Sequence, residues 1–343
     1  MPKLTKVEKK FFVDDGNNRG PMTMLRVRFH PRDSKLVASC ADRRIAWFDL
    51  TAEADQEVKG RGKCVVGELV CPHEIGWVRG LDVHPEGKQL ATGGSDRTLR
   101  VWAWKDGRPG EQPSHQVEAH GGWVEGVAYA PDGRLIATAG FDGLVKVWDS
   151  ADLKLLQTLE GHKRYVDDVA WSSDGKWLIS GGEDGQVIVR DTQSWQTLRT
   201  IEFGGANNQS GQIPKHSGVH RLAISRDDRW LGVAGGEQLS VFDLQSGEIV
   251  ASERDRMQVA FHPKADVLAG GESEAKFWSF EADKLTPPEK DKNGKPKSPQ
   301  GIPGKPFASV KRGEWSLGLQ FSADGKQVAL GNAAGIVELY DVG

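Results

Sequence analysis

Several features that define other classes of protein are missing from this sequence. It has no run of about 18 apolar residues that could span a membrane, and residues 1–15 contain no apolar stretch of signal-peptide length. The net charge is only −3, and lysine and arginine do not gather in one folded stretch. The positive field that draws proteins to DNA or RNA is therefore missing. We expect a cytoplasmic protein that binds neither nucleic acid nor membranes.

Cysteine is scarce, and the motifs of common enzymes are not found. The three cysteines, Cys40, Cys64 and Cys71, have no Cys-x-x-Cys spacing, which argues against a disulfide framework or a zinc site and favours reduced thiols. The sequence contains no Gly-x-Ser-x-Gly elbow, no P-loop and no His-Glu-x-x-His motif. We therefore expect no enzymatic activity, no cofactor and no metal.

Glycine and tryptophan are abundant instead, with 42 and 12 residues, and one pattern of residues returns seven times. Each unit has an alternating apolar segment, a short turn that often reads Pro-Asp-Gly, a second apolar run, a tight turn and a third run that ends near an aromatic-Asp pair. This pattern predicts three β-strands per unit. The third runs end at Phe48-Asp49, Trp102-Ala103, Trp148-Asp149, Arg190-Asp191, Phe242-Asp243, Trp278-Ser279 and Tyr340-Asp341.

These units resemble the WD repeat, and the resemblance extends from about residue 5 to Tyr340. That family has a hydrogen-bond network of His, Ser or Thr, Asp and Trp, in which each buried polar group satisfies another. The matching residues are His73, Thr92, Asp96 and Trp102 in unit two, His120, Thr138, Asp142 and Trp148 in unit three, and His162, Ser180 and Asp184 in unit four, where Arg190 replaces Trp. The resemblance implies an all-β, seven-bladed β-propeller with four-stranded antiparallel blades that occupies residues 1–343 as one domain.

The ends of the chain predict how the ring closes. The last unit stops after its third strand, at Tyr340-Asp341, whereas residues 6–12 form a spare strand candidate at the N-terminus. Because an unpaired strand edge promotes aggregation, we expect this N-terminal strand to complete the last blade.

Large aromatic residues stand at equivalent places before the first strand of several units, on the face that WD-repeat proteins generally use for partners. Aromatic side chains anchor interfaces because they bury much area and lose few rotamers. Packing between blades is the alternative explanation for each of them. The predicted partner-binding residues are Trp77, Arg79, Trp123, Glu125, Phe141, Tyr165, Asp167, Glu183 and Trp315.

Two insertions lengthen the repeat. Residues 204–217 extend a loop on the predicted partner face, and residues 282–306 are rich in lysine and proline and fall on the opposite face. The second insertion has few apolar residues to offset its ordering entropy, so we expect it to be flexible.

Three functions remain open at this stage. The resemblance favours a scaffold, monomeric on its own, that binds a protein or peptide partner. A propeller hydrolase or lactonase would need several acidic or His side chains from different blades to converge on the central axis. A purely structural module of a larger assembly is the third possibility, since fold does not fix function.

Overall fold

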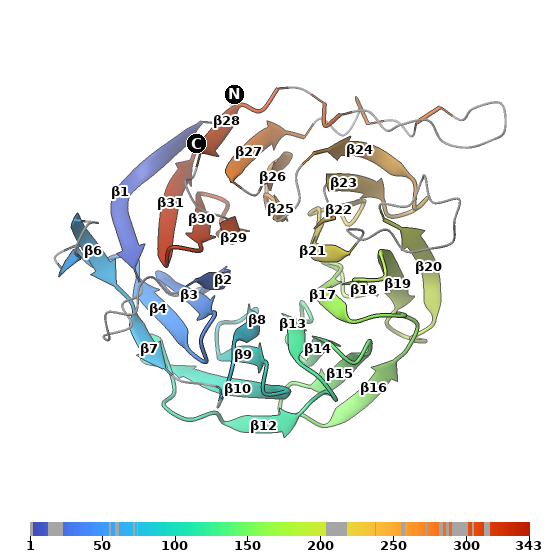
Figure 1. The fold of residues 1–343 in the computed structure, drawn as a ribbon, viewed down its shortest axis with the longest axis horizontal. Helices are drawn as coiled ribbons and strands as arrows, with labels where there is room; N and C mark the ends of the chain where they lie inside the picture. The colour runs from blue at the N-terminus through green and yellow to red at the C-terminus, as the bar shows by residue number, and fades with distance from the viewer. Residues whose placement is uncertain are drawn as a thin grey trace.

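The fold is a closed ring of seven small antiparallel sheets, each of which is one blade (Figure 1). It is seen in a computed structural model that describes residues 3–12, 23–54, 56–58, 62–70, 73, 75–203, 218–236, 238–254, 258–271, 273–280, 284–285, 288–289, 301–303, 305–311 and 316–343. The predicted all-β, seven-bladed propeller is confirmed. Within the described residues, no helix has the length and apolar character needed to span a bilayer.

Each blade runs from an inner strand next to the ring axis to an outer strand at the rim (Figure 1). The first three blades are β2 (Met24–Phe29), β3 (Lys35–Cys40), β4 (Ile45–Asp49) and β7 (Glu68–Val70); β8 (Val78–Val83), β9 (Gln89–Gly94), β10 (Thr98–Lys105) and β12 (His115–Glu118), with β11 (Arg108–Pro109) also on β10; and β13 (Val124–Tyr129), β14 (Leu135–Gly140), β15 (Val145–Asp149) and β16 (Leu155–Leu159).

The remaining blades follow the same order. They are β17 (Val166–Trp171), β18 (Trp177–Gly182), β19 (Gln186–Asp191) and β20 (Thr197–Glu202); β21 (Val219–Ile224), β22 (Trp230–Gly235), β23 (Gln238–Asp243) and β24 (Ile249–Glu253); β25 (Val259–Phe261), β26 (Val267–Gly270), β27 (Glu274–Ser279) and β28 (Ala308–Lys311); and β29 (Ser316–Phe321), β30 (Gln327–Asn332), β31 (Ile336–Val342) and β1 (Leu4–Phe12).

Apolar side chains fill the spaces between neighbouring blades. One buried cluster joins blades 1 and 2 and includes Ile45, Val78 and Trp102. Glycine allows the close approach of blades: a Cβ atom on Gly93 would lie only 2.4 Å from the Val124 side chain of the next blade. The core is therefore distributed around the ring as a series of contacts between blades.

The N-terminal strand closes the ring, as predicted. β1 pairs antiparallel with β31, with Leu4 opposite Val342 and Phe12 opposite Ile336. Phe11 is fully buried. β1 also pairs in parallel with β6 (Gly62–Val66), which forms a hairpin with β5 (Gln56–Val58). The N-terminal strand β1 therefore completes the last blade, and through β6 it also connects that blade to the β5–β6 hairpin, which lies between β4 and β7 in the sequence.

Buried histidines in the turns between inner and second strands link one blade to the next. His30 Nε2 lies 2.7 Å from the carbonyl oxygen of Gly87 in the following blade, and His262 Nε2 lies 2.7 Å from that of Gly325. Both glycines have positive φ, which glycine adopts without strain. These histidines therefore have a structural role in holding adjacent blades together.

The lysine-rich insertion is anchored in the core on both sides. Leu285 and Ile302 are buried in one cluster with Trp230 and Phe280. Residues 290–300 between them lie outside the described residues, as do residues 204–217 of the other insertion. The predicted flexibility of residues 282–306 therefore stays a prediction, and the buried leucine and isoleucine restrict it to the middle of the segment.

Candidate functional site

The structure brings the four predicted network residues of unit three into one chain of hydrogen bonds. Trp148 Nε1 donates to Thr138 Oγ1 over 2.9 Å, and Thr138 Oγ1 lies 2.8 Å from His120 Nε2. On its other side, His120 Nδ1 lies 2.9 Å from Asp142 Oδ1. With its ring proton on Nδ1, His120 donates to Asp142 and accepts from the Thr138 hydroxyl. The network thereby fixes the tight turn that carries Phe141.

Units two and four contain related networks. In unit two, Thr92 accepts from Trp102 Nε1 over 3.1 Å, and His73 lies between Thr92 and Asp96. In unit four, the guanidinium of Arg190 donates to Ser180 Oγ over 3.3 Å, so arginine supplies the hydrogen bond that tryptophan supplies in the other units. His162 lies between Ser180 and Asp184 as expected.

In six blades, a β-bulge interrupts the inner strand at the second residue of that strand. The pairing of inner and second strands shifts there, so one residue of each inner strand has no partner across the ladder. Bulges re-aim side chains and are frequent next to functional sites. The six bulged residues are Leu25, Arg79, Glu125, Asp167, His220 and Leu317. Four consecutive blades therefore place an ionisable group at this level of the ring.

Next to these bulges, a cation and two indoles form the first part of a continuous strip. The guanidinium carbon of Arg79 lies 4.7 Å from the ring centroid of Trp77 and 4.4 Å from that of Trp123. Arg79 Nη1 also forms an ion pair of 3.0 Å with Glu125 Oε2. Arg79 therefore joins blades 2 and 3 and holds both indoles by cation–π contact.

Two more aromatic rings continue the strip into blade 4. The ring centroids of Trp123 and Phe141 are 5.0 Å apart, and those of Phe141 and Tyr165 are 4.5 Å apart with nearly parallel planes. Trp77, Trp123 and Phe141 remain 45%, 40% and 44% exposed, and Tyr165 is half-buried. We call Trp77, Arg79, Trp123, Phe141 and Tyr165 the aromatic strip.

The inner edge of the aromatic strip is acidic. Burial, followed by the charges of Glu183, Asp167 and Glu125, raises the pKa of Tyr165 to about 12. Burial likewise raises the pKa of Asp167 well above its usual range, and the neighbouring carboxylates of Glu125 and Glu183 add to this effect. The three carboxyl groups therefore lie close enough beside the strip that each disfavours ionisation of the others.

Most of the predicted partner-binding residues thus lie together. Trp77, Arg79, Trp123, Phe141 and Tyr165 form the strip, and the predicted acidic residues lie along its inner edge. Trp315, the remaining predicted residue, lies outside the described residues. Sequence reasoning missed His220, although a signal was present: it follows Val219 in its unit as Asp167 follows Val166.

Ion pairs line the central cavity of the ring. A cavity of about 280 Å³ is lined by inner-strand residues of all seven blades. Within it, Arg26 Nη2 lies 3.0 Å from Asp168 Oδ1, and Arg28 Nε lies 3.0 Å from Asp82 Oδ1. These charged groups are paired with one another across blades, and pairing is required above all for the buried Arg26 and Asp168.

Comparison with known proteins supports the same family as the fold. The family model described as "WD domain, G-beta repeat" matches residues 67–103, 111–149 and 153–191. The match identifies WD repeats in these three segments, and they lie within a seven-bladed β-propeller. Members of this family generally bind proteins or peptides and are typically not enzymes.

One curated relative is Cilia- and flagella-associated protein 52 of Sus scrofa. It is 30% identical to this chain over 82 residues, which is 24% of this chain and 11% of that protein. The match therefore spans only a small part of the relative.

Proposed function

We propose that this protein is an interaction scaffold whose aromatic strip binds a protein or peptide partner. The observation that carries the proposal is a connected row of four aromatic rings and one guanidinium across three blades. Aromatic side chains of this kind dominate binding energy at interfaces. A partner that presents an apolar segment would bury the exposed faces of these rings.

Exposure of apolar side chains supports this location. Exposed large hydrophobic side chains in the described part of the chain are Ile75, Trp77, Trp123, Phe141, Leu155, Leu156 and Leu198. Ile75 is close in sequence to Trp77 and is 65% exposed, so it enlarges the apolar surface at the start of the strip. The three leucines lie instead on outer strands β16 and β20.

Packing between blades does not account fully for the strip. Phe141 and Tyr165 come from neighbouring blades and stack on each other, so they do contribute to the contact between blades. A residue that served only this contact would be buried, whereas Trp77, Trp123 and Phe141 keep 40% to 45% of their surface exposed. Mutual stacking restricts the rings before binding, which reduces the entropy lost when a partner docks.

The paired charges on the axis favour a scaffold over a propeller hydrolase or lactonase. Arg26 and Asp168 are engaged with each other, and so are Arg28 and Asp82. A purely structural module would need only a flat contact surface. That function would not explain why Arg79 lies between the indoles of Trp77 and Trp123. The predictions that the protein is cytoplasmic, monomeric and without contacts to nucleic acid or membranes stay predictions.

Paired substitutions within the strip test the proposal. In capture from native lysate, Trp77→Ala with Trp123→Ala should reduce recovery of the native partner, because each lost anchor costs about 2 kcal/mol or more in binding. The matched control is Leu155→Ala with Leu198→Ala, which removes comparably exposed apolar side chains from the outer strands. Thermal melting of both variants separates lost binding from lost folding.

The two variants have opposite expected outcomes. The strip variant should melt near the wild-type temperature and lose the partner, whereas the leucine variant should retain it. Full capture by the strip variant at native stability would contradict the proposal and would move the partner site to another surface.

A further inference from the structure

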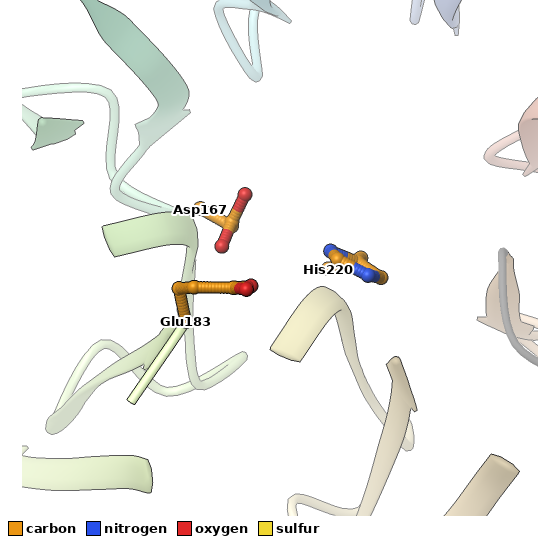
Figure 2. Close-up of side chains that lie close together, drawn as sticks. All are labelled: Asp167, Glu183 and His220. Atoms are coloured by element: carbon orange, nitrogen blue, oxygen red, sulfur yellow. The ribbon is translucent and has the colours of Figure 1, made fainter. Parts of the chain in front are cut away.

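We propose that Asp167, Glu183 and His220 form a binding site for a divalent transition-metal ion of the zinc type. One ligand atom from each residue lies within 4.8 Å of the other two. Figure 2 shows the two carboxylates and the imidazole directed toward a common space between blades 4 and 5. This inference does not depend on whether the aromatic strip binds a partner.

Three separate backbone segments bring these side chains together. Asp167 and His220 are the bulged residues of inner strands β17 and β21, so their side chains are re-aimed in the same way. Glu183 follows β18, and its backbone N–H donates to the Tyr165 carbonyl over 3.0 Å. The site therefore lies on paired strand ends of two adjacent blades.

A glycine makes room for the glutamate ligand. A Cβ atom on Gly218 would lie 1.9 Å from Glu183 Oε2, so any other residue there would displace this carboxylate. Gly218 is two residues from His220. The glycine therefore lets the Glu183 carboxylate of blade 4 reach over the backbone of blade 5 toward the histidine ring.

One ligand atom is buried without a partner. Asp167 Oδ2 is shielded from solvent and accepts no hydrogen bond from any residue that the structure describes. A buried carboxylate oxygen in this condition is unfavourable and needs a compensating group. A cation in the space between Asp167, Glu183 and His220 would supply it.

The imidazole is suited to coordination. His220 offers one ring nitrogen as a ligand atom beside the carboxylate oxygens of Asp167 and Glu183. Metal ions bind the neutral imidazole through a nitrogen lone pair.

The ligand set selects the class of ion. Imidazole together with carboxylate oxygen suits zinc and its first-row neighbours, whereas Mg²⁺ and Ca²⁺ prefer sites of oxygen alone. Zinc bonds of about 2.1 Å in a tetrahedron separate ligand atoms by about 3.4 Å, which is within the 4.8 Å limit on the present spacing. Three protein ligands leave a fourth position for water or a donor from outside the chain.

Zinc titration into the full-length chain tests the site. After removal of metal with EDTA, isothermal titration calorimetry should show one Zn²⁺ per chain, with Mg²⁺ unable to compete. His220→Ala should weaken zinc binding by at least about 10- to 100-fold, since even the loss of groups that only orient a ligand costs this much. His115→Ala, which removes an exposed histidine on β12, is the matched control and should bind like wild type.

A melting experiment provides a second readout. Zinc should raise the melting temperature of the wild type, because a ligand of the native state stabilises it, and this protection should vanish in His220→Ala and in the isosteric Asp167→Asn. No zinc binding by the wild type would overturn the proposal. Undiminished affinity and thermal protection in both ligand variants would also overturn it, because they would place the ion elsewhere.

Discussion

Replacing Thr138 by valine should destabilise the protein although the two side chains have nearly the same shape. The Thr138 hydroxyl lies 2.9 Å from Trp148 Nε1 and 2.8 Å from His120 Nε2, and both partners are only 2% exposed. Each buried group left without a partner costs about 1 to 3 kcal/mol. The added methyl group recovers about 0.8 kcal/mol, so we expect a net loss of about 1 to 5 kcal/mol for the two groups together.

Urea denaturation measures this loss as a lower midpoint with an unchanged slope. Thr158→Val is the matched control, because Thr158 is exposed on outer strand β16 of the same blade. A Thr138→Val midpoint equal to that of the control would refute the reasoning. Blade 5 has Val233 and Phe242 at the positions of Thr138 and Trp148, so Thr138→Val combined with Trp148→Phe should lose less than the sum of the single changes.

Three further predictions concern closure, the insertion and acid. Deleting residues 1–13 should lower the melting temperature and cause aggregation visible by light scattering, because the β31 edge loses β1; an unchanged monomer would contradict this. Leu285→Ala should lower the free energy of unfolding, measured by urea denaturation, by about 2 to 5 kcal/mol. A short Gly-Ser linker in place of residues 290–300 should leave the urea midpoint nearly unchanged. Equal effects of the two changes would disprove the anchoring. Burial alone would raise the pKa of Asp142, but hydrogen bonds and charge from His120 outweigh it and lower that pKa to about 2. The stability from this depressed pKa is present above the unfolded value of 3.8 and is lost as pH falls toward 2, so urea midpoints of Asp142→Asn should fall less than those of wild type over this range.

The architecture was predictable because each unit carries its own local pattern. Strand alternation and the ends of the third strands recur in every unit, and turn glycines recur in most of them, so the number of blades follows from local sequence. Closure was also predictable, because the last unit lacks a fourth strand and the N-terminus has a spare one. Both inferences need no knowledge of distances between blades.

Contacts between units were harder to predict. His220 was missed because its proximity to Asp167 and Glu183 depends on how two blades are oriented around the ring. In unit four, Arg190 stands where tryptophan was expected, so the sequence did not predict a hydrogen bond to Ser180. The structure shows that Arg190 forms this bond. Leu285 was missed as a core residue because its apolar neighbours come from another blade and its own segment is polar.

The central claim is that the aromatic strip is the partner-binding surface, and hydroxyl-radical footprinting of the captured complex tests it most directly. The free protein should be oxidised at Trp77, Trp123 and Phe141, which are 45%, 40% and 44% exposed, and also at Leu155 and Leu198 on the outer strands. In the complex, we predict protection of the three aromatic residues and unchanged oxidation of the two leucines. Protection of the leucines with the aromatic residues still oxidised as in the free protein would contradict the account.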